Sequence, residues 1–141
     1  MPVRKSSATW DGGLKGGKGS YKAESGLSGA YSFGSRFENA KASNPEELLA
    51  AALAACYSMA LSGALEKNGT PSTRVATEVA CTIEKVGEGF KITKMHLVTR
   101  AKVPNANAAA FEKIAQATKD GCPVSQVFKG TVPLTLEAKL E

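Results

Sequence analysis

Three cysteines are the side chains of this sequence with the greatest capacity for covalent chemistry. They stand at positions 56, 81 and 122 of a 141-residue chain that contains a single histidine. Their spacing does not resemble a zinc site, and His96 falls on the polar side of a predicted strand, so we predict no metal centre. Without a disulfide framework, such cysteines are buried, catalytic or redox-active.

The local sequences predict different environments for Cys81 and Cys122. Cys81 lies between Val79 and Ile83 on the inward side of an alternating strand, where a thiol behaves as a small hydrophobic group. Cys122 follows a glycine turn and precedes Pro123, which predicts the N-cap of a short helix. Unpaired backbone N–H groups there favour a thiolate at Cys122, and a half-buried cap without reactivity is the alternative.

Cys56 lies in an apolar helix, where the default is a core residue whose pKa is raised by burial. Reactivity would require a cation, and the sequence offers Arg36, with Glu46 as a carboxylate to hold it. Glu46 precedes Cys56 by about 15 Å of helical rise, so the two cannot touch in one chain. In a dimer with antiparallel helices the partner's carboxylate would come closer. We therefore predict that any Cys56 site lies at a subunit interface and takes groups from both chains.

This apolar helix is the longest element that the sequence predicts. Asn44 is a suitable N-cap, Pro45 suits the first helical position, and Gly69 supplies the end. No charged residue occurs from Leu48 to Leu65, which indicates burial on all sides. A membrane span is the other interpretation of such a run, but this one is rich in alanine and contains serine and glycine. Because one small sheet covers only one face of a helix, we predict a homodimer.

The remaining patterns predict an α+β fold, with antiparallel sheets packed on the long helix in one domain, residues 1–141. Apolar alternation and turn residues predict strands at 7–11, 18–24, 27–34, 74–86, 90–103 and 132–140, with a bulge near Thr93-Lys94. A second helix is predicted at 107–120, and a short third one starts after Cys122 and ends at Gly130.

The composition excludes several classes of protein. Hydrophobic residues at 43% and charged residues at 22% are ordinary for a globular chain. The net charge of +5 is scattered and aromatic residues are 6%, so we predict no nucleic-acid binding. The N-terminus lacks the apolar core of a signal peptide, which favours a cytoplasmic protein with reduced thiols, and we predict no membrane association.

Four segments are distinctive in combination: Arg36-Phe37-Glu38, Asn44–Leu49, Ala54–Leu61 and Cys122–Ser125. Together they resemble one family, the OsmC/Ohr thiol peroxidases. The order of strands and helices is also similar over essentially the whole chain. The first and third segments are closer to the OsmC branch, the osmotically inducible protein C-like proteins.

The resemblance implies an intertwined homodimer that reduces organic hydroperoxides, and hydrogen peroxide more weakly, without metal, flavin or other cofactor. Carried over to this chain, Cys56 is the peroxidatic thiolate and Cys122 the resolving thiol that closes a disulfide with it. Arg36 stabilises the thiolate and Glu46 holds the arginine. Cys81 has no counterpart in the motif. An external thiol, for which dihydrolipoyl groups are one candidate, would reduce the disulfide during oxidative or osmotic stress.

Two alternatives stay open at the level of sequence. The protein could be a non-catalytic dimeric module that binds a small hydrophobic ligand at its interface, with Cys56 serving only in packing. Within the peroxidase interpretation, the local sequence favours Cys122 as the thiolate, whereas the resemblance assigns the first attack to Cys56. We follow the resemblance, because Cys122 has no obvious arginine partner.

Overall fold

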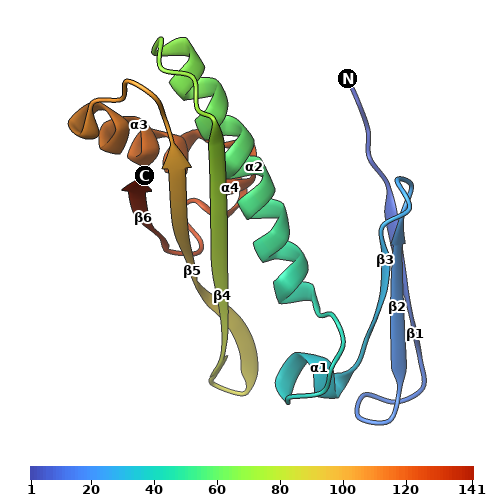
Figure 1. The fold of residues 1–141 in the computed structure, drawn as a ribbon. Helices are drawn as coiled ribbons and strands as arrows, with labels where there is room; N and C mark the ends of the chain where they lie inside the picture. The colour runs from blue at the N-terminus through green and yellow to red at the C-terminus, as the bar shows by residue number, and fades with distance from the viewer. The chain divides into compact units, whose positions relative to one another are not determined.

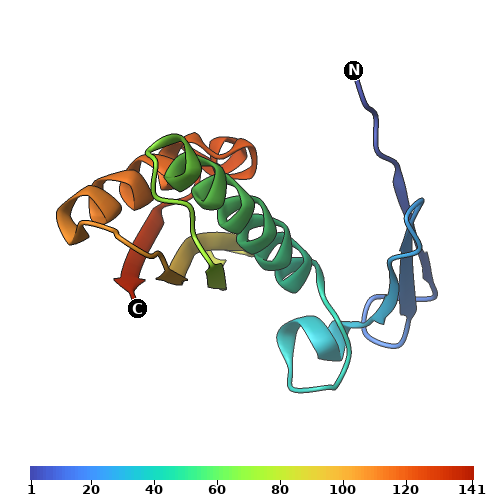
Figure 2. The same cartoon turned by 45° about the horizontal axis from the view of Figure 1, so that its top comes forward.

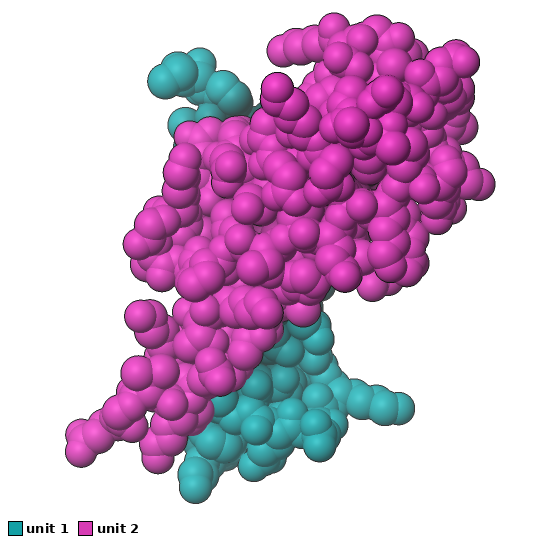
Figure 3. Space-filling model, turned by 90° about the vertical axis from the view of Figure 1, so that its left-hand side faces the viewer, with its two compact units in different colours: residues 1–48 teal, residues 49–141 magenta.

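A computed structural model describes all 141 residues, and it divides into two compact units, residues 1–48 and 49–141, which Figure 3 distinguishes by colour. Both units contain strands and helices, as expected for an α+β protein, and the division falls in the first turn of the long helix. The elements are β1 (Ser6–Asp11), β2 (Lys18–Ala23), β3 (Ser28–Tyr31), α1 (Phe33–Phe37), α2 (Pro45–Lys67), β4 (Arg74–Val86), β5 (Gly89–Lys102), α3 (Ala108–Gly121), α4 (Pro123–Phe128) and β6 (Leu134–Leu140).

The N-terminal unit is an antiparallel meander of β1, β2 and β3, followed by α1 (Figure 1). Gly19 on β2 is required because a Cβ there would lie 2.5 Å from the Tyr31 ring. The sequence predicted that the third strand would run to residue 34 and that a loop would follow. The strand instead ends at Tyr31, because Ser32 and Ser35 form a reciprocal capping box that starts α1.

The C-terminal unit contains a sheet with strand order β4-β5-β6. Strands β4 and β5 form a long antiparallel hairpin with the predicted inward alternation on β4. Thr82 pairs with Lys94, whereas Ile83 pairs with Ile92, so Thr93 is the extra residue of a bulge. The bulge predicted near this point is therefore confirmed.

Strand β6 differs from the antiparallel arrangement that we predicted. It runs parallel to β5, in a register that pairs Met95 with Leu134 and Ala101 with Leu140. The reason is the connection: α3 and α4 return the chain to the starting end of β5, and a long crossover of this kind joins parallel strands. Helix α3 contacts β6 and α4.

The core of this unit lies between α2 and one face of the sheet. Leu53, Tyr57, Leu61 and Leu65 recur every four residues along α2 and are buried. They join buried side chains of β5 and α3, among them Met95, Leu97, Ala101, Phe111 and Ala115. Helices α2, α3 and α4 all lie on this face of the sheet, and no helix of this unit covers the opposite face (Figures 1 and 2).

The side of α2 that faces away from this core is apolar and exposed. Ala51, Ala52 and Ala55 are exposed, and Met59 is 75% exposed. The helix is long and apolar enough to cross a membrane. However, its buried side packs in a protein core, and Ser58 donates a 2.8 Å hydrogen bond to Thr77 on β4. We therefore interpret α2 as a core helix of which a single chain buries only one side.

Candidate active site

Cys56 and Cys122, the two predicted redox thiols, contact each other in the C-terminal unit. Cys56 lies on α2, one residue before the buried Tyr57, and is itself partly exposed. The Cys122 side chain and the backbone N–H of Val124 lie close enough to Cys56 to act on the pKa of its thiol through hydrogen bonding. Neither thiol is in a disulfide. The structure therefore places two reduced thiols next to each other.

Cys122 occupies the junction between α3 and α4, as the sequence predicts. It is the N-cap of α4: its Sγ accepts the backbone N–H of Ser125 at 3.4 Å, and Pro123 follows it in the helix. The Oγ of Ser125 lies 2.9 Å from the same sulfur. Cys122 is only 2% exposed and Ser125 is fully buried, so water does not compete for these bonds.

The surroundings of Cys56 oppose its ionisation. Burial raises the pKa of the Cys56 thiol, and the adjacent Cys122 raises it further through the hydrogen bond and through its charge when ionised. The Val124 N–H acts in the opposite direction, because it stabilises the Cys56 thiolate, but it does not outweigh burial. A fast thiolate at Cys56 therefore requires a positive charge that the C-terminal unit does not supply at this sulfur.

Arg36 and Glu46, the other two predicted site residues, form an ion pair in the N-terminal unit. Nε and Nη2 of Arg36 donate to the same carboxylate oxygen, Oε1 of Glu46, at 2.9 and 2.8 Å. The Arg36 side chain is 38% exposed and that of Glu46 only 7%. The second carboxylate oxygen, Oε2, is buried and has no hydrogen-bond partner. The guanidinium is thus held on one side and accessible on the other.

A network of short bonds fixes the loop that connects these two residues. Asn44 accepts the N–H of Glu47 at 2.8 Å, which confirms the predicted N-cap of α2. Its side-chain N–H donates to the carbonyl of Ser35, and the Ser35 hydroxyl donates to the carbonyl of Ser43. Because these bonds join α1 to the start of α2, they position Arg36 against Glu46.

The four predicted residues are therefore brought together as two pairs, one in each unit. Sequence reasoning missed Ser125 and Val124, which contact the sulfurs. Ser125 carries a signal, because it stands at the third position after a predicted N-cap. The contact of Val124 is made by its backbone and has no side-chain signature.

The other residues that the sequence singled out lie apart from this chemistry. Cys81 is half-buried against the core on β4, as predicted for a structural cysteine. His96 lies on the opposite face of the sheet, where its Nδ1 is 2.6 Å from the Thr135 hydroxyl. The chain has no cluster of three or more histidine, cysteine or acidic side chains able to hold a metal ion.

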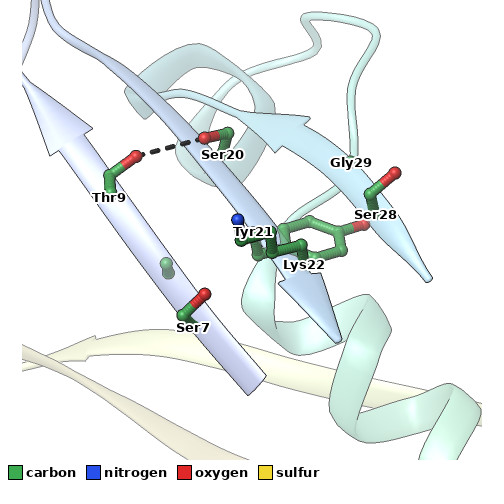
Figure 4. A pocket seen from close by; sticks show the side chains of 8 residues that line it. Ser7, Thr9, Ser20, Tyr21, Lys22, Ser28 and Gly29 are labelled. Atoms are coloured by element: carbon green, nitrogen blue, oxygen red, sulfur yellow. Dashed lines mark hydrogen bonds between the residues drawn. The ribbon is translucent and has the colours of Figure 1, made fainter. Parts of the chain in front are cut away.

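A shallow hollow in the N-terminal unit lies over the meander of β1, β2 and β3 (Figure 4). Most of the residues around it carry hydroxyl groups, and the hydroxyls of Thr9 and Ser20 are hydrogen-bonded at 3.1 Å. The lining includes Lys22 but neither a cysteine nor an acid. It therefore lacks the groups for peroxide chemistry, and we assign no reaction to it.

Known proteins resemble this chain in both sequence and fold. A family model described as OsmC-like protein matches residues 38–137. Peroxiredoxin OsmC of Escherichia coli (strain K12) is 44% identical over 138 residues, 96% of each chain. Organic hydroperoxide resistance protein OhrA of Bacillus subtilis (strain 168) is 30% identical over 101 residues, which are 69% of this chain and 67% of that protein. The chain therefore belongs to the OsmC family.

A solved structure extends the likeness of fold to almost the whole chain. The OsmC like protein from Mycoplasma pneumoniae has a TM-score of 0.78 at 12% identity, covering 99% of this chain and 97% of that one. At this identity the likeness concerns the fold alone. The relatives in sequence identify the chain as an enzyme of the peroxidase class. The alternative of a non-catalytic binding module loses its support.

Proposed function

We propose that the protein reduces organic hydroperoxides, and hydrogen peroxide more weakly, with Cys56 as the peroxidatic thiol and Cys122 as the resolving thiol. The observation that carries this proposal is the proximity of the two thiols, which is close enough for the Cys122 side chain to raise the pKa of Cys56. Two neighbouring thiols of suitable geometry can form a disulfide. The name of the Bacillus relative, an organic hydroperoxide resistance protein, supports the choice of substrate.

The proposed reaction has two steps on the protein. The Cys56 thiolate attacks the terminal oxygen of the hydroperoxide, the O–O bond breaks, and the alkoxide leaves and takes up a proton to become an alcohol. The product on the enzyme is a sulfenic acid. The Cys122 thiolate then attacks the Cys56 sulfur, an S–S bond forms, the S–O bond breaks, and hydroxide leaves as water after protonation. An external dithiol supplies two electrons to reduce the disulfide.

We further propose that the protein works as a homodimer and that Arg36 stabilises the Cys56 thiolate across the subunit interface. Three observations support this. Burial raises the pKa of Cys56, so its thiolate needs a cation. Glu46 holds Arg36 from one side and leaves the guanidinium partly exposed. The exposed apolar side of α2, which includes Met59, is a surface that a second copy would cover.

The partners and setting complete the proposal. The reductant is a small or carrier-bound dithiol of the dihydrolipoyl type, and the reaction takes place in the cytoplasm during oxidative or osmotic stress. The scattered positive charge gives no basic stripe for nucleic acid. No cofactor enters the proposed steps, because both electrons pass through the two sulfurs.

The proposal is tested by thiol-dependent consumption of an organic hydroperoxide such as cumene hydroperoxide. We expect Cys56→Ser to abolish turnover, and Cys122→Ser to allow a single oxidation of Cys56 without turnover. Cys81→Ser is the matched control, because it replaces the remaining thiol, and it should retain turnover. Equal single-turnover oxidation in Cys56→Ser would reverse the two cysteine roles.

A further inference from the structure

Ser125 contacts the thiol pair, and the reaction above gives it no task. It lies on α4 and is fully buried. Its hydroxyl has one hydrogen-bond partner in the chain, the Sγ of Cys122 at 2.9 Å, and its backbone N–H reaches the same sulfur at 3.4 Å. A buried hydroxyl with a single partner depends on that partner for its hydrogen bond.

We propose that Ser125 is a positioning residue for the resolving step: it holds Cys122 in place and supplies a hydrogen bond to its sulfur as the thiol becomes a thiolate. This inference rests on the proposed function, because it assumes that Cys122 resolves the sulfenic acid. A serine hydroxyl can both accept and donate. It can therefore accept the S–H of Cys122 before ionisation and donate its own O–H afterwards.

The two sulfurs have different partners, so the proposed role of Ser125 concerns Cys122 and not the reaction at Cys56. The backbone N–H of Val124 acts on the Cys56 sulfur, whereas the backbone N–H of Ser125 donates to the Cys122 sulfur and the Ser125 hydroxyl lies within hydrogen-bond distance of that same sulfur. The hydroxyl of Ser125 makes no hydrogen bond to Cys56. Its loss should therefore act on the second step, in which Cys122 carries the charge, and leave the first step unchanged.

The chemistry of the second step explains why such a bond matters there. Cys122 must lose its proton, and its sulfur must approach the Cys56 sulfur along the direction from which hydroxide departs. A hydrogen bond to an ionised acceptor is stronger than one to a neutral acceptor. The Ser125 bond therefore strengthens at the moment of attack and also limits rotation of the Cys122 side chain.

The experiment follows one turnover of the reduced full-length protein after mixing with one equivalent of cumene hydroperoxide. Acid quenching at successive times and intact mass separate the sulfenic acid, which gains one oxygen, from the disulfide, which loses two hydrogens. The variants are Ser125→Ala, which removes the hydroxyl, and Ser125→Thr, which retains it. Ser62→Ala is the matched control. It removes a serine hydroxyl on α2 that accepts a hydrogen bond from Ser72 and not from either thiol.

We expect Ser125→Ala to form the sulfenic acid at the wild-type rate but to close the disulfide about tenfold more slowly, as for loss of a hydrogen bond to a charged group. The sulfenic acid should then accumulate and, with excess peroxide, be oxidised to sulfinic acid. Ser125→Thr should restore closure. Wild-type closure in Ser125→Ala, or equal slowing of both steps, would overturn the inference. If wild-type protein forms neither species, the proposed function itself fails, which is a distinct result.

Discussion

Cys56 presents a conflict between its proposed role and its surroundings. A peroxidatic cysteine reacts as the thiolate, yet burial and the neighbouring Cys122 raise the pKa of Cys56. The Val124 N–H opposes this shift without cancelling it. A cation must therefore stabilise the Cys56 thiolate. Arg36 is the candidate, because its guanidinium is held by Glu46 while one side stays accessible.

Removing this cation should shift the pH dependence of peroxide reduction. In Arg36→Ala the Cys56 thiolate loses its counter-charge, so the pKa of Cys56 stays raised and the thiolate forms only at higher pH. The rate of the first step should then fall about tenfold or more at neutral pH, and recover as the pH rises. The measurement is the single-turnover rate of sulfenic acid formation across a pH series.

The control for this prediction is Arg100→Ala. Arg100 is an exposed arginine on β5, on the face of the sheet opposite to α2. Arg100→Ala lowers the net charge by the same amount as Arg36→Ala, but it changes a residue on the other face of the sheet from the thiols. A pH profile in Arg36→Ala that matches those of Arg100→Ala and wild-type protein would contradict the role of Arg36.

Replacing the carboxylate that holds the arginine should have a weaker effect of the same kind. Glu46→Gln keeps the shape of the side chain but loses the charge that pairs with the guanidinium. Arg36 remains present but is less well positioned, so we expect a loss of first-step rate smaller than that of Arg36→Ala. The two variants are compared in the same single-turnover assay. A larger loss in Glu46→Gln than in Arg36→Ala would argue against a purely positioning carboxylate.

At the scale of elements, α2 joins the site to the core. Its buried line packs on β5 and α3, and the hydroxyl of Tyr57 donates a 2.9 Å hydrogen bond to the carbonyl of Ala115. Tyr57 follows Cys56 directly, so this bond fixes the turn of α2 that carries Cys56. Burial raises the pKa of the Tyr57 phenol, and it stays protonated as a donor at neutral pH.

Breaking that bond should destabilise the fold measurably. Tyr57→Phe leaves the ring in the core and removes only the buried hydroxyl. The free energy of unfolding should fall by about 1 kcal/mol, the typical net value of one hydrogen bond. Urea denaturation measures this change. Tyr31→Phe is a suitable control, because the Tyr31 hydroxyl makes no hydrogen bond in the chain, and equal losses in both variants would rule out a special role for the Tyr57 bond.

The sequence predicts most elements because their signals are local. The caps at Asn44 and Cys122 and the bulge at Thr93 all follow from residues close to them in the chain, and the structure confirms each. The parallel pairing of β6 was not predictable from its alternation, because alternation defines which side chains face inward but not the direction of the neighbouring strand. The sequence did not predict helix α1, because five residues are too few to show a helical repeat of apolar positions.

The candidate site is only partly predictable, for a related reason. The thiols and the ion pair were named from residue type together with a resemblance, and the pairs Cys56 with Cys122 and Arg36 with Glu46 contact each other in the structure. The contact of the Val124 N–H with a sulfur depends on how α4 packs against α2. Such a contact depends on tertiary packing and cannot be recognised from the type of the residue.

At the scale of the whole molecule, the exposed side of α2 is the feature that a single chain leaves unexplained. Exposed apolar side chains along it include Ala51, Ala52, Ala55 and Met59. Soluble proteins rarely leave a continuous apolar surface of this kind in contact with water. Together with the charge that Cys56 lacks, this surface supports the proposal that two copies associate and complete each other's sites.

A charge placed on this surface should separate the subunits. In Met59→Glu the carboxylate would be buried without a partner, which should raise the Kd of the dimer at least about a hundredfold, corresponding to about 3 kcal/mol. Light scattering across a concentration series measures the association, and peroxide reduction should fall with the dimer. Ala80→Glu adds the same charge at an exposed position on β4. A dimer of unchanged stability in Met59→Glu would contradict this interface.

The proposed redox pair is tested most directly by the intact mass of reduced wild-type protein after one equivalent of an organic hydroperoxide, followed by peptide mapping. We predict a rapid loss of two hydrogens, located in a bridge between Cys56 and Cys122, and no such bridge in Cys56→Ser. This result would establish that these two thiols form the redox pair. No rapid change in mass, or a bridge that includes Cys81, would contradict this pairing and leave Cys56 as a packing residue of α2.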